Sequence, residues 1–118
     1  MSFASDWAKV DADIAAIVGA RPSEYDPVVR ANLADLIALL KATDRHAPLV
    51  EPGYWPTFNL SWDVEGAENL TVEVFGDHYE IYRFFDGKTD IWHDDHRPGE
   101  ALSQALLDEL PPAAENAR

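Results

Sequence analysis

The sequence predicts an α+β domain in which helices from both ends of the chain pack on one face of an antiparallel sheet. Two stretches near the start and one near the end carry apolar residues at helical spacing. Between them, residues 58–93 alternate apolar and polar side chains and contain Gly-Asp and Asp-Gly turn signals, a pattern typical of hairpin strands. Helices that are segregated from hairpin strands indicate an α+β architecture.

Two helices are predicted first, over residues 5–18 and 27–43. The second has the clearer start, because Asp26 suits an N-cap and Pro27 suits the first helical position. The loop between the helices is short, so we expect an antiparallel helical hairpin. A third helix is predicted within residues 98–112, where a Pro-Gly-Glu turn opens it and two prolines stop it.

A four-stranded meander is predicted between the second and third helices. Residues 46–56 contain three prolines and two aromatic residues, which indicates an ordered loop. The strands follow at residues 58–64, 70–74, 78–85 and 89–93, and each pair is joined by a tight turn. We expect the C-terminal helix to pack on this sheet.

The 118-residue length is typical of one domain with its own core, which we place at residues 1–112, with a frayed tail at residues 113–118. The chain has no cysteine, which excludes disulfide scaffolds, zinc ribbons and thiol nucleophiles. The longest nearly apolar run, residues 33–40, is too short to cross a bilayer. The first residues lack the basic and apolar regions of a signal peptide, so we expect a cytoplasmic protein.

The most unusual property of the chain is its charge. It has 22 acidic and 9 basic residues, and its formal net charge is −13 at pH 7. Nucleic acids and anionic membranes are repelled by such a surface, which argues against both as direct ligands. A basic protein is the partner that this charge favours. The alternative is that the acidity only keeps the protein soluble.

We expect the partner to contact one acidic, partly aromatic face of the sheet together with the loop at residues 86–96. Alternation along the strands places Glu73 on the wet face, opposite the core. Like charges on neighbouring strands destabilise a sheet, so a chain that retains them is expected to use their field. The predicted partner-binding residues are Asp63, Glu65, Glu73, Glu80, Tyr82, Asp86, Asp90, Trp92, Asp94 and Asp95.

No catalytic motif is present, and we expect neither enzymatic activity nor a cofactor. The nucleophile elbow, the P-loop and the dinucleotide-binding glycine pattern are all missing. One alternative is a small metal-dependent enzyme in which His93 and His96 act as ligands, since imidazole and carboxylate groups cluster in residues 90–96. A catalytic metal needs further converging ligands, and neither His46 nor His78 completes the set by sequence.

Residues 54–63 (YWPTFNLSWD) followed by residues 70–74 (LTVEV) resemble a strand pair found in small uncharacterised bacterial and phage proteins. In size, acidity and lack of catalytic motifs, the chain is also similar in type to anti-CRISPR and other anti-defence proteins of phages, several of which imitate nucleic acid with carboxylates. This resemblance implies an inhibitor of a basic, nucleic-acid-handling protein. The alternative binding role is an antitoxin or immunity protein that neutralises a cognate toxin.

Overall fold

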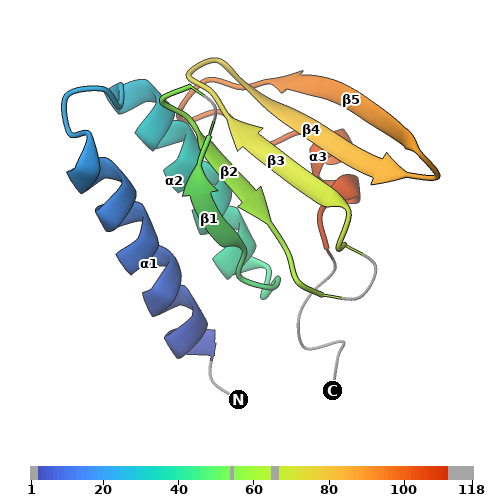
Figure 1. Cartoon of the computed structure of the whole chain (residues 1–118), viewed down its shortest axis with the longest axis horizontal. Helices are drawn as coiled ribbons and strands as arrows, with labels where there is room; N and C mark the ends of the chain where they lie inside the picture. The colour runs from blue at the N-terminus through green and yellow to red at the C-terminus, as the bar shows by residue number, and fades with distance from the viewer. Residues whose placement is uncertain (1–2, 54, 65–66, 112–118) are drawn as a thin grey trace.

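The computed structural model describes residues 3–53, 55–64 and 67–111, and these residues form the predicted α+β architecture (Figure 1). In chain order the elements are α1 (Phe3–Ala20), α2 (Pro27–Ala42), β1 (Leu49–Pro52), β2 (Phe58–Ser61), β3 (Leu70–Val74), β4 (His78–Phe85), β5 (Lys88–Asp95) and α3 (Gln104–Glu109). The predicted tail at residues 113–118 and the predicted site residue Glu65 lie outside the described residues.

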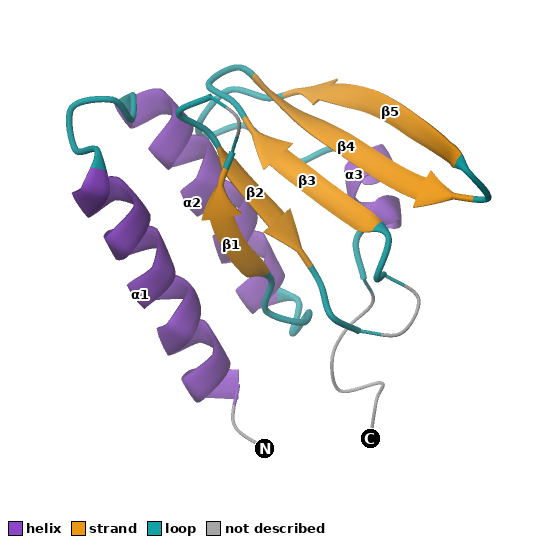
Figure 2. Cartoon of the chain, in the orientation of Figure 1, coloured by secondary structure: helices purple, strands orange, loops and turns teal. Residues whose placement is uncertain are grey.

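The sheet has five strands, not the four that were predicted. Its order is β1-β2-β3-β4-β5, and every neighbouring pair is antiparallel, so the sheet is a simple meander (Figure 2). The additional strand, β1, lies inside the predicted loop at residues 46–56 and pairs with β2. It has four residues, of which only Val50 is buried, and it ends at Pro52. A strand this short shows no alternation, and proline is tolerated at its edge position.

The helices define an inner and an outer face of the sheet. In Figure 1, α2 and α3 lie behind the sheet and α1 lies alongside β1, at the edge. Two contacts fix the inner face: the Tyr79 hydroxyl donates to the Asn32 carbonyl of α2 at 2.6 Å, and Arg83 pairs with Glu109 of α3 at 3.0 Å. The outer face is the opposite side, and none of the described helices covers it.

The core lies between the inner face and the helices. From the strands it takes alternate residues, which face one side because the side-chain period of a strand is two. α2 supplies the largest helical share, and its N-cap is formed as predicted, since Asp26 Oδ1 accepts from the Val28 amide at 2.8 Å. The fully buried large side chains are Tyr79, Phe58, Leu36, Leu40, Leu60, Leu70, Ile81, Leu106, His96, Val10, Val72 and Val74.

Several element boundaries differ from the sequence prediction, and the two largest differences lie in the last third of the chain. The third helix begins at Gln104 rather than near residue 100, and Ser103 is its N-cap, accepting from the Leu106 amide at 3.1 Å. The last strand is longer than predicted, because pairing with β4 continues to Asp95. The predicted contact loop at residues 86–96 is therefore mostly an edge strand. Among the described residues, no helix combines the length and the apolar character needed to span a membrane.

Candidate functional site

A row of polar side chains crosses the outer face of the sheet, one from each strand. Directly opposed residues of antiparallel neighbours point to the same face, so register alone places them together. In strand order the row consists of Glu51, Asn59, Glu73, Glu80 and His93. Glu73 and Glu80 of this row were predicted site residues, and the register makes them immediate neighbours.

Glu73 is buried, which corrects the expectation that it lies on a wet face. It is 6% exposed although no described helix covers this side of the sheet. Thr57 Oγ1 donates to Glu73 Oε2 at 2.5 Å, and the Tyr82 hydroxyl is 3.2 Å from Glu73 Oε1. The chain between β1 and β2 makes this possible, because it carries Thr57 onto the carboxylate. A buried carboxylate is tolerated here because both of its oxygens have hydrogen-bond partners.

Tyr82 connects Glu73 to Glu80. Its hydroxyl makes a short hydrogen bond to Glu80 Oε1 in addition to its contact with Glu73. The hydrogen bond from Tyr82, followed by that from His78, outweighs burial and holds the pKa of Glu80 below its usual range. Burial, and then the hydrogen bond to Glu80, raise the pKa of the Tyr82 phenol. Glu80 is therefore held ionised and Tyr82 is held neutral at physiological pH.

His78 lies between two carboxylates at the end of the same network. Its Nδ1 is 2.6 Å from Asp77 Oδ1, and its Nε2 is 3.1 Å from Glu80 Oε2. Burial lowers the pKa of His78, but the hydrogen bonds to Asp77 and Glu80 together outweigh it and raise the pKa above its usual value. The ring also stacks on Phe75 at 4.4 Å and meets the edge of His93 at 5.6 Å.

An apolar strip lies beside this polar network on the outer face. Phe84 is 48% exposed, and its ring is parallel to that of Tyr82 with a centroid distance of 6.4 Å. Ile91 is 60% exposed and is directly opposite Tyr82 across the β4–β5 pair. Large apolar side chains left in water beside fixed charges are typical of a protein-binding surface.

The remaining predicted residues do not form one face. Alternation along β5 puts Asp95 on the outer face with Ile91, but it turns Asp90, Trp92 and Asp94 toward the other side. Trp92 packs against the core, and Asp94 Oδ2 is buried without a hydrogen-bond partner in the described part of the chain.

Two further predicted residues lie beyond the ends of the strands. Asp63 is exposed just after β2, and Asp86 is exposed in the β4–β5 turn. The structure therefore brings together Glu73, Glu80 and Tyr82 and places Asp95 at the end of the same face. It separates from them the other predicted residues that it describes, which are Asp63, Asp86, Asp90, Trp92 and Asp94.

The two histidines considered as metal ligands have separate environments. His96 is 1% exposed, and its Nε2 is 2.9 Å from Asp35 Oδ2 of α2. His93 is an exposed side chain of the outer face, 3.7 Å from Asp95. Within the described ranges, no three His, Asp or Glu side chains are grouped as metal ligands.

The contact between His96 and Asp35 was not predicted. Asp35 also accepts from the Gly99 amide at 2.9 Å, and Asn32 Nδ2 donates to the His96 carbonyl at 3.2 Å. These contacts attach the segment after β5 to α2, so they are structural. The one available signal was Asp35 itself, a carboxylate within an otherwise apolar helical run.

Comparisons with protein-family models, with curated proteins and with solved structures find no match to this chain.

Proposed function

We propose that this chain is a non-enzymatic binding protein that holds a basic protein on the outer face of its sheet, and that it thereby inhibits a nucleic-acid-handling partner. The observation that carries the proposal is the composition of this face. Exposed apolar side chains, Phe84 and Ile91, flank Tyr82, whose hydroxyl is hydrogen-bonded to the carboxylates of Glu73 and Glu80. Apolar anchors with a charged surround are the usual anatomy of a protein interface.

The charge of the chain specifies the chemistry of the partner. A net charge of −13 steers a basic surface toward the chain and repels polyanions. Proteins that handle nucleic acids carry such basic surfaces, because they must neutralise phosphates. A carboxylate-bearing face that occupies a phosphate-binding surface competes directly with the nucleic acid. Inhibition then follows because the phosphate-binding surface of the partner is blocked, and no catalysed reaction is needed.

The proposed contact surface uses only some of the residues that were predicted from the sequence. Glu80, Tyr82 and Asp95 are the predicted residues that lie accessible on the outer face, and Phe84 and Ile91 join them as anchors. Glu73 becomes a supporting residue, because it is buried and holds the Tyr82 hydroxyl.

The first test is competition. The chain is immobilised, a basic DNA- or RNA-binding protein is captured from bacterial lysate at low salt, and the purified pair is titrated with nucleic acid. We expect mutual exclusion, with one ligand displacing the other. A ternary complex would overturn inhibition by occupancy. Capture of a toxin that binds no nucleic acid would replace this proposal with the antitoxin alternative.

A matched pair of variants tests the location. Asp95→Lys reverses a charge on the outer face, where the side chain is 89% exposed. Asp108→Lys makes the same change in net charge on α3, on the other side of the sheet. We expect Asp95→Lys to weaken the complex about tenfold and Asp108→Lys to have little effect. Equal effects would show that net charge, and not this face, drives binding.

A further inference from the structure

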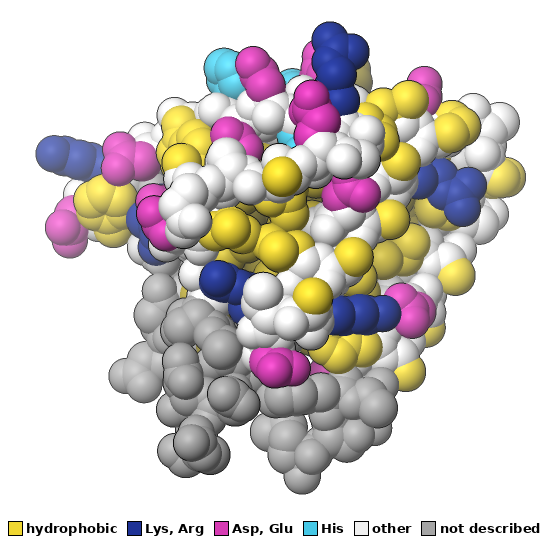
Figure 3. Space-filling view, turned by 180° about the vertical axis from the view of Figure 1, so that it is seen from behind, with side chains coloured by type: hydrophobic (Ala, Val, Ile, Leu, Met, Phe, Trp, Pro, Cys, Tyr) yellow, Lys and Arg dark blue, Asp and Glu magenta, His cyan; other side chains and the backbone are white. Residues whose placement is uncertain are grey.

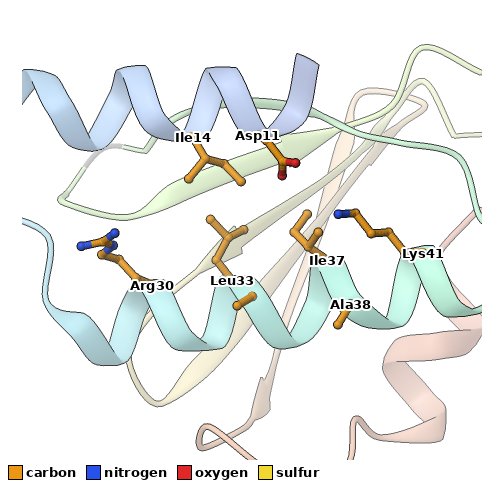
Figure 4. Close-up of a pocket in the computed structure, with 8 residues that line it drawn as sticks. Asp11, Ile14, Arg30, Leu33, Ile37, Ala38 and Lys41 are labelled. Atoms are coloured by element: carbon orange, nitrogen blue, oxygen red, sulfur yellow. The ribbon is translucent and has the colours of Figure 1, made fainter. Parts of the chain in front are cut away.

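A groove of about 410 Å³ separates α1 from α2, on the helical side of the molecule and away from the outer face of the sheet (Figure 4). Its volume is within the range of small-molecule sites. The α2 residues that line it are 30, 33, 34, 37, 38 and 41, a spacing that places all six along one side of a helix. The groove is therefore a continuous channel along α2 and not a gap at one point.

The middle of the groove is apolar. Leu33 and Ile37 of α2 are buried at its floor, and the half-buried Ile14 faces them from α1. Ala34 and Ala38 add small side chains that leave the space open. The space-filling view from behind also shows hydrophobic side chains gathered in the middle of this side, with Lys and Arg side chains beside them (Figure 3).

The ends of the groove carry basic residues, which is unexpected in so acidic a chain. Arg30 and Lys41 are eleven residues apart on α2, about 16 Å at the helical rise. Arg30 has no carboxylate within ion-pair distance among the described residues. Lys41 differs, because its Nζ lies 5.5 Å from the Trp7 ring, and Figure 4 shows Asp11 nearer to Lys41 than to Arg30. The end at Arg30 is thus the more favourable one for an anion.

We infer that this groove binds an anionic amphiphile, a long-chain carboxylate, with its head group at Arg30 and its chain along Leu33 and Ile37. The guanidinium supplies a forked donor that matches a carboxylate. The apolar floor shields the hydrocarbon from water. The assignment is independent of the proposed function, because it uses a different side of the molecule and a ligand of a different class.

The net charge makes the inference testable with two probes of equal chain length. Dodecanoate and dodecyltrimethylammonium share the tail and differ in the sign of the head group. Non-specific attraction to a chain of net charge −13 favours the cation. A preference for the anion therefore requires a local basic site. Below the critical micelle concentration, we expect isothermal titration calorimetry to show saturable, one-to-one binding of dodecanoate and weaker binding of the cation.

Two pairs of variants locate the site. Arg30→Gln and Lys41→Gln make the same change in charge at opposite ends, and we expect about tenfold weaker dodecanoate binding for the first and a smaller effect for the second. Ala34→Phe fills the groove from an exposed position, whereas Ala12→Phe adds the same bulk to an exposed position of α1 that does not line it. We expect the first to abolish binding and the second to preserve it.

Three results would overturn the inference. They are equal or tighter binding of the cation, dodecanoate binding that survives Ala34→Phe, and a dimer that Ala34→Phe dissociates but dodecanoate does not. The last would show that a second copy of the chain occupies the groove. Circular dichroism of each variant checks that the fold is retained. If Ala34→Phe unfolds the chain, the pair Arg30→Gln and Lys41→Gln still tests the site.

Discussion

Thr57 Oγ1 donates a 2.5 Å hydrogen bond to the carboxylate of Glu73, and this contact buries a charged side chain on the face of the sheet that no described helix covers. The two residues are sixteen positions apart, and Thr57 comes from the segment between β1 and β2 whereas Glu73 is in β3. Because Glu73 also meets the Tyr82 hydroxyl, which is hydrogen-bonded to Glu80, this contact belongs to a network that includes both glutamates. The polar groups of the candidate binding face are therefore held in place by buried hydrogen bonds.

Thr57→Val removes the hydroxyl and keeps the shape of the side chain. It leaves Glu73 Oε2 buried without its donor, which costs about 1–3 kcal/mol of the free energy of unfolding. Urea unfolding monitored by tryptophan fluorescence measures the loss. Thr57→Ser, which keeps the hydroxyl, is expected to be close to the wild type. Equal stability of the valine and serine variants would mean that the hydrogen bond contributes nothing.

Gly53 permits the close approach of Thr57 and Glu73. A Cβ at this position would overlap Thr57 Oγ1 and lie 2.8 Å from Glu73 Oε2. Gly53→Ala is therefore expected to destabilise the protein by about 1–3 kcal/mol, as overpacking does elsewhere. Gly19→Ala is the control, because a Cβ there meets nothing within 4 Å, and alanine in α1 is expected to stabilise by up to about 1 kcal/mol. Thermal unfolding of both variants should show shifts of opposite sign.

Asp35 makes the stability of the fold sensitive to acid. Burial raises the pKa of Asp35, but the hydrogen bonds from the His96 imidazole and the Gly99 amide outweigh it and hold the pKa below its usual range. A carboxyl pKa that is lower in the folded state stabilises the fold above the ordinary carboxyl pKa, and this contribution is lost as pH falls through the lowered value. Asp35→Asn removes the contribution at all pH values.

The measurement is the free energy of unfolding of wild type and Asp35→Asn as a function of pH. At neutral pH the variant is expected to be less stable by about 2 kcal/mol, the scale of a charge-assisted hydrogen bond, and the difference should shrink below about pH 4. Asp108→Asn, on the exposed side of α3, is the control. A difference for Asp35→Asn that stays constant down to low pH would contradict the assignment.

The sequence predicted those features that depend on local pattern. Asp26 and Pro27 marked the start of α2, and the two glycine-containing turns marked the hairpins around β4. The sequence did not predict β1, because a four-residue strand with one buried residue shows no alternation of apolar and polar side chains. The burial of Glu73 could not be predicted either, since alternation assigns a face but not what covers it. The Glu73 carboxylate is covered by Thr57, which belongs to the segment between β1 and β2.

The candidate site was predicted only in part for the same reason. Glu73, Glu80 and Tyr82 were among the predicted contact residues, and the register makes them neighbours on the outer face. Asp90, Trp92 and Asp94 were grouped with them by proximity in the sequence, although the strand period turns them to the other side. β5 was predicted to end at His93, so its acidic end was treated as a loop, in which alternation does not apply.

His78 is a histidine of the outer face that lies between two carboxylates. Burial lowers its pKa, but the hydrogen bonds to Asp77 and Glu80 outweigh burial, and the net shift is upward. A histidine pKa that is raised in the folded state stabilises the fold below the ordinary imidazole pKa, and this stabilisation is lost as pH rises through the raised value. The imidazolium therefore persists into a higher pH range than that of an isolated histidine.

Glu80→Gln removes one of the two carboxylates that hold the His78 imidazolium. The midpoint of the His78 titration, followed by NMR of the ring protons, is expected to move to lower pH in this variant. Glu51→Gln changes charge in the same polar row without contacting His78, and it should leave the midpoint nearly unchanged. A His78 midpoint that is the same in wild type and Glu80→Gln would show that the 3.1 Å contact between His78 and Glu80 does not form in solution. Glu80 contacts both His78 and Tyr82, so a partner that binds beside Tyr82 is expected to disturb Glu80 and thereby shift the midpoint of the His78 titration. The same NMR titration can therefore be used to detect binding at this face.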